Sequence, residues 1–152
     1  MKTVIVGGVA GGMSAATRLR RLDEQAEIVV FERSGHVSFA NCGLPYYVGG
    51  VITDRNALLL QTPKSLKSRF GIDVRVDSEV TAIDPAAKTV AVTDLASGRQ
   101  YIESYDNLIL APGAAPFVPP IPGVERALAL RNIADVDKLS DAVAEALTVA
   151  EP

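Results

Sequence analysis

Short apolar runs in the first third of the chain are separated by a glycine-rich turn and a helical segment. Residues 3–6 are apolar or β-branched, residues 7–12 include four glycines, and residues 13–19 favour a helix. A second apolar run at residues 28–31 is followed by a glutamate. Strand, glycine turn, helix and strand in this order are typical of a nucleotide-binding unit with a parallel sheet.

The middle of the chain predicts a short helix, one strand and an antiparallel meander. Thr62 and Pro63 form an N-cap pattern that starts a helix reaching about residue 70. Residues 73–76 follow as a strand. Alternating runs separated by turn residues then predict three short antiparallel strands, at residues 79–84, 89–94 and 99–104.

The last third predicts a buried strand, an extended connector and a helix. Residues 108–111 form a continuous apolar run of the kind buried on both faces of a parallel sheet, and a proline-glycine pair ends it. Residues 116–123 hold four prolines and predict a stiff connector. Residues 132–150 predict a helix whose apolar stripe consists of Val136, Leu139, Val143 and Leu147.

These elements predict an α/β fold of three layers, Rossmann-like, with a parallel sheet and an antiparallel β-meander. The parallel sheet is expected to contain residues 3–6, 28–31, 74–76 and 108–110. We expect residues 1–115 to form the first part of one domain. Residues 116–152 would be a Pro-rich connector and a helix that lead towards a further domain.

Composition and charge exclude several classes of protein. The 152 residues are 48% hydrophobic, which is enough for a packed core. A net charge of −3, without a Lys- or Arg-rich face, argues against a nucleic-acid partner. One cysteine forms no internal disulfide, and the sequence shows neither a leader nor an apolar run of about 18 residues. We therefore expect a cytoplasmic protein without a membrane partner or a metal site.

The glycine turn has the pattern of a dinucleotide-binding turn except at its middle position. Gly7 permits the tight turn, Gly12 lets helix and strand pack closely, and the first helical amides meet the pyrophosphate. Val9 occupies the place of the usual middle glycine, so the turn is a weak signal by itself. Glu32 lies 20 residues beyond Gly12, at a strand end where it would bind a ribose hydroxyl. We prefer dinucleotide binding over a chance glycine turn and a solvated Glu32.

Cys42 is the only cysteine and the candidate for redox chemistry. Gly43 and Pro45 after it fit the first turn of a helix, where backbone N–H groups would favour the thiolate. The alternative is a small buried hydrophobe, which is the common role of a single cysteine. The only histidine, His36, follows a glycine in a loop and is expected to be solvated.

Four segments resemble the amino-terminal part of the pyridine nucleotide-disulfide oxidoreductases that use a single redox cysteine, namely coenzyme A-disulfide reductases, NADH oxidases and NADH peroxidases. The segments are residues 6–16, 31–32, 38–46 and 105–113. The resemblance implies an FAD/NAD(P)-binding Rossmann-like fold, with FAD on the first glycine turn and NAD(P)H as the electron donor on a separate domain. The cofactor contacts that it implies are Gly7, Gly8, Val9, Ala10, Gly11, Gly12, Glu32, Arg33, Val80, Ala111, Pro112 and Gly113.

The resemblance also implies the chemistry. Cys42 would face the flavin and pass electrons to a disulfide. The residues that match the coenzyme A contacts of the reductases are Ser14, Arg18, Arg21, Ser38 and Asn41. Arginines suit the phosphates of coenzyme A. Ala10 occupies the position where the peroxidases and related oxidases carry a histidine, so a disulfide is preferred over peroxide as the substrate.

We therefore expect the FAD- and cysteine-bearing segment of an enzyme resembling coenzyme A-disulfide reductase. Two alternatives stay open: an NADH oxidase in which Cys42 cycles through a sulfenic acid, and a nucleotide-binding module without catalysis. A complete family member adds a nicotinamide domain, the returning half of the flavin domain and a carboxyl-terminal interface domain. That last domain completes the active site of the partner subunit, so we expect a homodimer and expect full turnover to require these parts.

Overall fold

The computed structural model describes residues 1–149, and the described chain forms two compact units. The sheet unit comprises Met1–Phe39 and Gln61–Gly113. The helical unit comprises Ala40–Leu60 and the chain from Ala114 onwards. The glycine turn thus belongs to the sheet unit, and the cysteine belongs to the helical unit.

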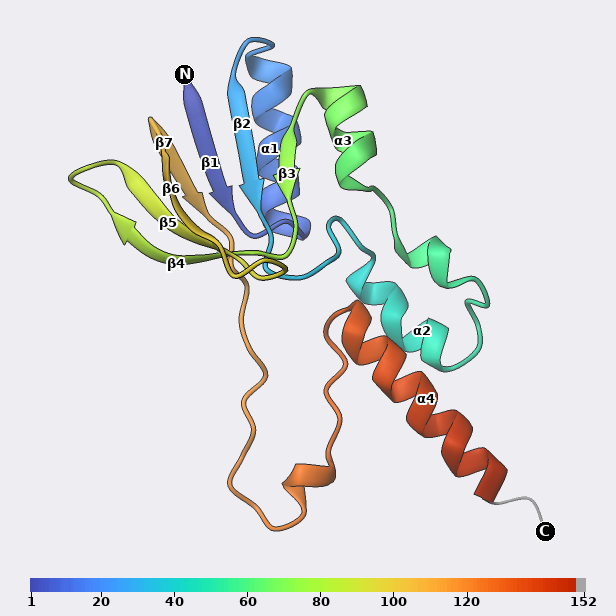
Figure 1. The fold of residues 1–152 in the computed structure, drawn as a ribbon. Coiled ribbons are helices and arrows are strands. Elements are labelled where there is room, and N and C mark those ends of the chain that lie inside the picture. The colour runs from blue at the N-terminus through green and yellow to red at the C-terminus, as the bar shows by residue number, and fades with distance from the viewer. Residues whose placement is uncertain (150–152) are drawn as a thin grey trace. The chain divides into compact units, whose positions relative to one another are not determined.

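The sheet unit is built on four parallel strands in the order β3-β2-β1-β7 (Figure 1). These strands are β1 (Lys2–Val6), β2 (Glu27–Phe31), β3 (Asp73–Arg75) and β7 (Asn107–Leu110). In the register of the sheet, Val4 pairs with Val29 on one side and with Leu108 on the other. Because the strands are parallel, the turns that follow β1, β2 and β7 meet at one edge. The predicted four-stranded parallel sheet is confirmed.

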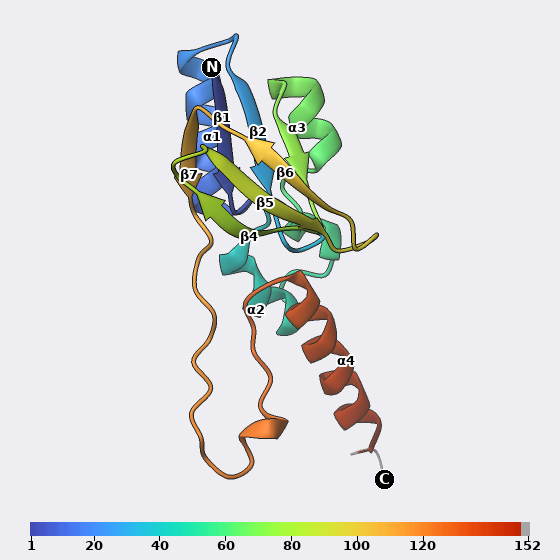
Figure 2. The same ribbon diagram turned by 60° about the vertical axis from the view of Figure 1, so that its left-hand side comes forward.

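Two other layers cover the faces of this sheet (Figure 2). Helices α1 (Ala10–Leu22) and α3 (Pro63–Phe70) pack on one face. The antiparallel meander on the other face consists of β4 (Ser78–Asp84), β5 (Thr89–Asp94) and β6 (Gln100–Ser104). Successive side chains of β1 point to opposite layers: Ile5 lies in the core on the helix side, whereas Val4 packs with Val92 of the meander. The expected three-layer fold with a meander is confirmed.

Helix α3 begins and ends at the residues that its sequence predicts. The Thr62 hydroxyl accepts the N–H of Ser65, and the Ser65 hydroxyl accepts the N–H of Thr62, which forms a capping box. Gly71 ends the helix with a left-handed φ of +61°.

Strand β7 corrects one expectation. The sequence predicts a strand buried on both faces, but Leu108 and Ile109 are half-buried and Leu110 is 57% exposed. Among the described residues β7 pairs only with β1, so it is the edge strand of this sheet. An apolar run therefore predicts the strand correctly but not its burial, which depends on its neighbours.

The helical unit contains the helices α2 and α4, which pack together, and short 3₁₀ turns. Its described elements are η1 (Asn41–Gly43), α2 (Leu44–Val48), η2 (Arg55–Leu58), η3 (Val124–Arg126) and α4 (Ile133–Val149). Arg55 donates two hydrogen bonds to the Asp137 carboxylate, at 2.7 and 2.8 Å. This ion pair joins η2 to α4.

The predicted last helix is confirmed over the described residues, but only one end of its apolar stripe is covered. Val136 is buried and Leu139 is half-buried, whereas Val143 is 40% exposed and Leu147 is 65% exposed. Position 150 lies outside the described residues. None of the helices in the described part of the chain is long and apolar enough to cross a membrane.

Candidate functional site

The two glycine turns of the sheet unit touch each other. Gly7 has φ +101°, and a Cβ atom there would overlap the carbonyl oxygen of Ala111. A Cβ atom on Gly12 would overlap the carbonyl oxygen of Gly7. The N–H of Gly7 donates to Phe31, and the N–H of Ala111 donates to Val6, both at 2.8 Å. Glycine is therefore required at both positions by close main-chain contacts, and the two predicted turns open on one sheet edge.

The N-terminus of α1 suits an anion. Val9 is its N-cap residue and makes no side-chain capping hydrogen bond, and the first turn carries no acidic residue. Gly11 is exposed, and within 4 Å a Cβ there would meet only the Cβ of Ala111, at 3.5 Å. Uncapped N–H groups and the positive end of a helix attract phosphate groups. The turn thus fits the pyrophosphate of a dinucleotide although Val9 replaces its middle glycine.

Glu32 is held by hydrogen bonds. Its Oε2 accepts the N–H of Gly8 at 2.7 Å, and its Oε1 accepts both the N–H and the hydroxyl of Ser34 at 2.8 Å. A Cβ on Gly8 would lie 2.9 Å from the Cβ of Glu32, so this contact needs the glycine. Glu32 is therefore half-buried and fixed by these bonds, and its contact with a ribose stays a prediction. Ser34 was not predicted, and a hydroxyl residue two positions after a strand-end glutamate is the signal that could have found it.

The remaining predicted cofactor contacts of the sheet unit differ in their burial and in their contacts with other residues. Val80 in β4 packs on the apolar cluster between the parallel sheet and the meander. Arg33 is exposed and forms an ion pair with Glu79 at 3.5 Å. Pro112 and Gly113 follow β7 and are exposed. The contact of each with a cofactor stays a prediction.

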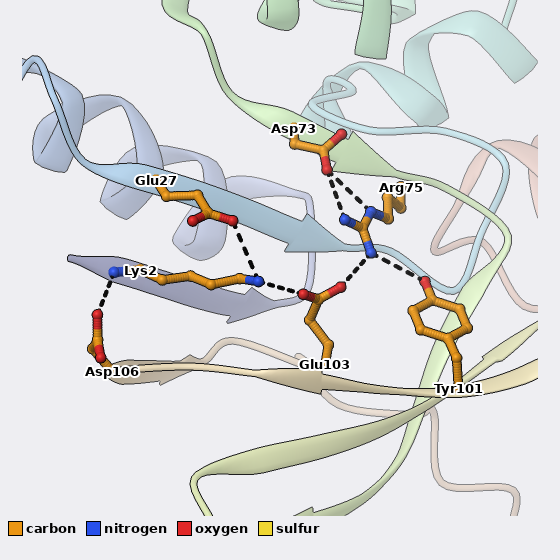
Figure 3. Close-up of polar contacts among 7 residues, drawn as sticks. All are labelled: Lys2, Glu27, Asp73, Arg75, Tyr101, Glu103 and Asp106. Carbon is orange, nitrogen blue, oxygen red and sulfur yellow. Dashed lines mark hydrogen bonds and ion pairs between the residues drawn. The ribbon is translucent and has the colours of Figure 1, made fainter.

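A charged network joins the meander to the parallel sheet (Figure 3). Glu103 of β6 accepts hydrogen bonds from Lys2 in β1 and from Arg75 in β3. Arg75 also forms an ion pair with Asp73 at 2.9 Å and donates to the Tyr101 hydroxyl at 3.4 Å. The sequence patterns described above do not indicate this network. Its signal is the two-residue spacing of Asp73 and Arg75, and of Tyr101 and Glu103, which places each pair on one face of its strand.

The network shifts the pKa values of its members. Burial raises the pKa of Glu103, but the hydrogen bonds from Lys2 and Arg75 outweigh burial and hold it below its usual value. The hydrogen bond to Glu103 raises the pKa of Lys2. Burial lowers the pKa of Arg75, but its hydrogen bonds to Tyr101, Glu103 and Asp73 raise that pKa above its usual value. All three groups are therefore charged at neutral pH.

The first helix carries exposed candidates for substrate binding. They are Ser14, Arg18 and Arg21. Arg20 is structural, because its guanidinium donates to main-chain carbonyls, including that of Phe70 at 2.7 Å. Arg21 and Arg69 line an open hollow of about 620 Å³ beside this contact. Glu24 lines the same hollow, so its walls carry both signs of charge, and a phosphate contact of Arg21 stays a prediction.

Two other predicted substrate contacts have definite local roles. Ser38 has φ +50°, a left-handed conformation that is unfavourable for residues other than glycine, and its N–H donates to Gly8 at 2.9 Å. Asn41 belongs to the helical unit, where its side-chain amide donates to the carbonyl of Arg131 at 3.4 Å. Their contacts with a substrate stay predictions.

Cys42 is exposed, so the buried-hydrophobe interpretation is wrong. It lies in η1, and α2 begins two residues later at Leu44 with Pro45 in its first turn. The cysteine thus precedes the helix instead of standing in its first turn, because a separate 3₁₀ turn spans it. Gly43 is buried, and a Cβ there would lie 3.0 Å from Leu58. An exposed thiol on a closely packed turn is able to attack a disulfide, and its redox role stays a prediction.

Comparisons with known proteins show which family the chain resembles in sequence and in fold. A family described as pyridine nucleotide-disulphide oxidoreductase matches residues 1–149. The coenzyme A disulfide reductase of Staphylococcus epidermidis is 46% identical over 114 residues, which are 75% of this chain and 26% of that protein. The chain thus spans about a quarter of the length of this curated relative.

Solved structures agree as well. The reduced CoADR-RHD of Bacillus anthracis is 52% identical with a TM-score of 0.91, over 96% of this chain and 27% of that one. A water-forming NADH oxidase from Lactobacillus brevis, bound to NADH, is 35% identical with a TM-score of 0.87, over 95% of this chain and 32% of that one. The predicted fold class is confirmed, and the expected FAD and NAD(P)H are the cofactors of the matched family.

Proposed function

This chain belongs to the pyridine nucleotide-disulphide oxidoreductase family, and we propose that it is the FAD- and cysteine-bearing segment of an enzyme like coenzyme A disulfide reductase. In the complete enzyme, electrons would pass from NAD(P)H by way of FAD to coenzyme A disulfide. The observation that carries the proposal is the hydrogen bond from Gly8 to Glu32. It places a carboxylate beside an uncapped helix N-terminus, which is the pair of groups that a dinucleotide needs.

The sheet unit would hold FAD through its main chain and one carboxylate. The N–H groups at the start of α1 would bind the pyrophosphate. Glu32 has lone pairs left for a ribose hydroxyl after its bonds to Gly8 and Ser34. Val80 would lie near the adenine. Bound FAD supplies two-electron redox chemistry.

The helical unit would supply the thiol. The Cys42 thiolate would attack one sulfur of coenzyme A disulfide and form a mixed disulfide, while the other coenzyme A leaves as a thiolate. Two electrons then have to enter to release the second coenzyme A and restore the thiolate. Arg18 and Arg21 would bind phosphates of the substrate, and Ser14, Ser38 and Asn41 would form its other polar contacts.

The thiol step is testable with this chain alone. The reduced chain is mixed with coenzyme A disulfide, and its mass and the released thiol are followed. We expect one coenzyme A bound through Cys42 and one coenzyme A released, with no adduct on Cys42→Ser. Arg21→Gln should slow this reaction roughly tenfold but leave the reaction with cystamine, which has no phosphate, unchanged. A coenzyme A substrate would be contradicted if wild type reacted with coenzyme A disulfide no faster than with cystamine and Arg21→Gln changed neither rate.

The cofactor is tested separately. We expect the chain to take up FAD and to retain it through gel filtration with the absorption band of a bound flavin. A chain that takes up no FAD after reconstitution would support the alternative of a nucleotide-binding module without catalysis. This outcome is independent of the thiol reaction, so the two halves of the proposal can fail separately.

The similarity to a water-forming NADH oxidase supports one second candidate function. Its identity of 35% is lower than the 52% of CoADR-RHD. In the complete enzyme, oxygen consumption with NADH and no release of coenzyme A from its disulfide would replace the first proposal with the oxidase.

Three finer expectations about the complete enzyme are also proposals: a homodimer, a cytoplasmic location and a domain division after residue 115. Sedimentation of the complete enzyme tests the first, cell fractionation the second, and limited proteolysis near residue 115 the third. A monomer that turns over at the full rate would contradict the shared active site on which the dimer is expected.

A further inference from the structure

Arg75 is the last residue of β3 and takes part in fixing the main chain of Glu32. Its carbonyl oxygen accepts the Glu32 N–H at 2.9 Å, and the N–H of Ser78 donates to the Glu32 carbonyl at 3.0 Å. The short link from β3 to β4 therefore binds Glu32 on both sides. The position of this link determines where the Glu32 side chain begins.

The guanidinium of Arg75 reaches the meander (Figure 3). It donates to the Tyr101 hydroxyl at 3.4 Å and to Glu103 at 2.5 Å. It also lies 5.4 Å from the centre of the Phe31 ring, at the end of β2. One side chain thus contacts β2 and β6 while its own main chain holds the residue after β2.

Tyr101 belongs to the row of paired residues that contains Val80. Tyr101 pairs with Val92, and Val92 pairs with Val80. The pairing of β4 with β5 shifts directly after Val80, and such a bulge fixes the register of a strand. The side chains of Tyr101, Val92 and Val80 also pack on the same apolar cluster. A displacement of Tyr101 would therefore reach Val80 through cross-strand side-chain packing.

These contacts require a guanidinium. Its Nε donates to Asp73 at 3.0 Å while its Nη1 bonds to Glu103 and Tyr101. A lysine ammonium is a point charge on a flexible stem and lacks this planar arrangement of donors. Arg75→Lys consequently keeps the positive charge between Asp73 and Glu103 but cannot form all three hydrogen bonds at once.

We propose that Arg75 is a positioning residue for the adenosine half of FAD, acting on Glu32 through its carbonyl oxygen and on Val80 through Tyr101. The inference rests on the proposed function, because Glu32 and Val80 are predicted FAD contacts. It goes further in assigning a role to a residue that neither the glycine turn nor the cysteine segment includes.

Titration of Arg75→Lys with FAD and with ADP tests the inference, since ADP contains only the adenosine and pyrophosphate part. Both dissociation constants should rise roughly fivefold to tenfold. The loss should shrink in a Glu32→Ala background, because the part that acts through the carboxylate disappears and only the part that acts through Val80 remains. Arg99→Gln is the matched control: Arg99 lies 5.0 Å from the Tyr101 ring centre but is exposed, and its variant should bind FAD as wild type does.

Wild-type affinity of Arg75→Lys for FAD and ADP would overturn the inference. An equal loss in the wild-type and Glu32→Ala backgrounds would also overturn it, because a general weakening of the fold acts in this way. If Arg75→Lys does not fold, Tyr101→Phe removes one hydroxyl and should weaken FAD binding about twofold, and unchanged binding would count against the inference. A wild-type chain that binds neither FAD nor ADP would overturn the proposed function and this inference with it.

Discussion

The glycine turn of the sheet unit and the cysteine turn of the helical unit are held in different ways. In the first, main-chain atoms meet so closely that a Cβ on Gly7 or Gly12 would overlap a carbonyl oxygen. In the second, Cys42 is exposed, and side chains such as Arg55 join segments that are distant in sequence. Gly7 and Gly12 therefore tolerate no added atom. The helical unit is instead held by individual side-chain contacts, and we expect the loss of any one of them to cost little.

Gly12→Ala is expected to have the largest effect on folding. The new methyl group would overlap the carbonyl oxygen of Gly7, and a main-chain neighbour cannot move aside as a flexible side chain can. We expect the free energy of unfolding, measured with urea, to fall by roughly 3 kcal/mol. Wild-type stability of Gly12→Ala would show that the main chain around Gly12 can move to accept a methyl group, which would contradict the close contact described here.

Gly11→Ala is the matched control one residue earlier. Its methyl group would make only an ordinary contact, at 3.5 Å from Ala111. Because alanine favours a helix more than glycine does, the chain should keep its stability or gain up to about 1 kcal/mol. The methyl group would nevertheless occupy the space where the pyrophosphate is proposed to approach, so FAD affinity should fall. This outcome would separate packing of the turn from binding at the turn.

Glu103→Gln should have the next largest effect, on the contact between the meander and the parallel sheet. It removes the negative charge that lies between Lys2 and Arg75. We expect the free energy of unfolding to fall by roughly 1.5 to 3 kcal/mol at neutral pH. Glu79→Gln is the control, because its ion pair with exposed Arg33 should contribute less than about 1 kcal/mol.

The same variant should change the dependence of stability on pH. The pKa of Glu103 in the folded chain lies below its usual value of about 4.5. Its contribution is therefore fully present above that value and is lost as the pH falls through the lowered folded pKa. Unfolding curves of wild type and Glu103→Gln should converge in this acid range. Curves that stay equally far apart at all pH values would contradict a charged Glu103.

Local sequence patterns predict the strands and the glycine turns, because adjacent residues determine both. β-Branched runs indicate strands, and Gly7 and Gly12 indicate close main-chain contacts, whatever lies elsewhere in the chain. The burial of Leu110 depends instead on which strands flank β7, and no residue near Leu110 specifies them. The sequence therefore predicts elements better than their surroundings.

The candidate site divides in the same way. The spacing from the glycine turn to Glu32 is a local signal, and the structure adds a hydrogen bond from Gly8 to this carboxylate. The role of Arg75 depends on Tyr101 and Glu103, which reach it only after the meander has folded onto the sheet. One sequence contains many acidic residues with which a distant arginine could pair. Spacing alone therefore does not predict that Arg75 contacts Glu103.

Glu32→Ala should weaken FAD binding by about 1.5 to 3 kcal/mol, or roughly tenfold or more in affinity. The reason is the loss of a charge-assisted hydrogen bond to the ribose. Ser34→Ala is the companion variant, because it removes one hydroxyl bond to Oε1 and keeps the main-chain N–H bond. It should weaken binding less. Unchanged affinity in Glu32→Ala would mean that the carboxylate serves only Gly8 and Ser34.

Arg55→Met should have the smallest effect and tests the helical unit. The hydrogen bond to Asp137 raises the pKa of Arg55, but both side chains are partly solvated, with 34% and 45% exposed. Water and salt screen such a pair, so we expect a loss of about 0.5 to 1 kcal/mol that shrinks at high salt. Amide hydrogen exchange along α4 measures it.

Lys138→Met is the control for Arg55→Met, because it removes the same charge from an exposed position on α4. It should leave the exchange rates of α4 unchanged, whereas Arg55→Met should raise them roughly twofold to fivefold. The rate at which iodoacetamide alkylates Cys42 should change little in either variant, because the thiol is already exposed. Arg55→Met could instead destabilise the helical unit as much as Gly12→Ala destabilises the sheet unit. The two turns would then not differ in how much a single contact contributes to stability.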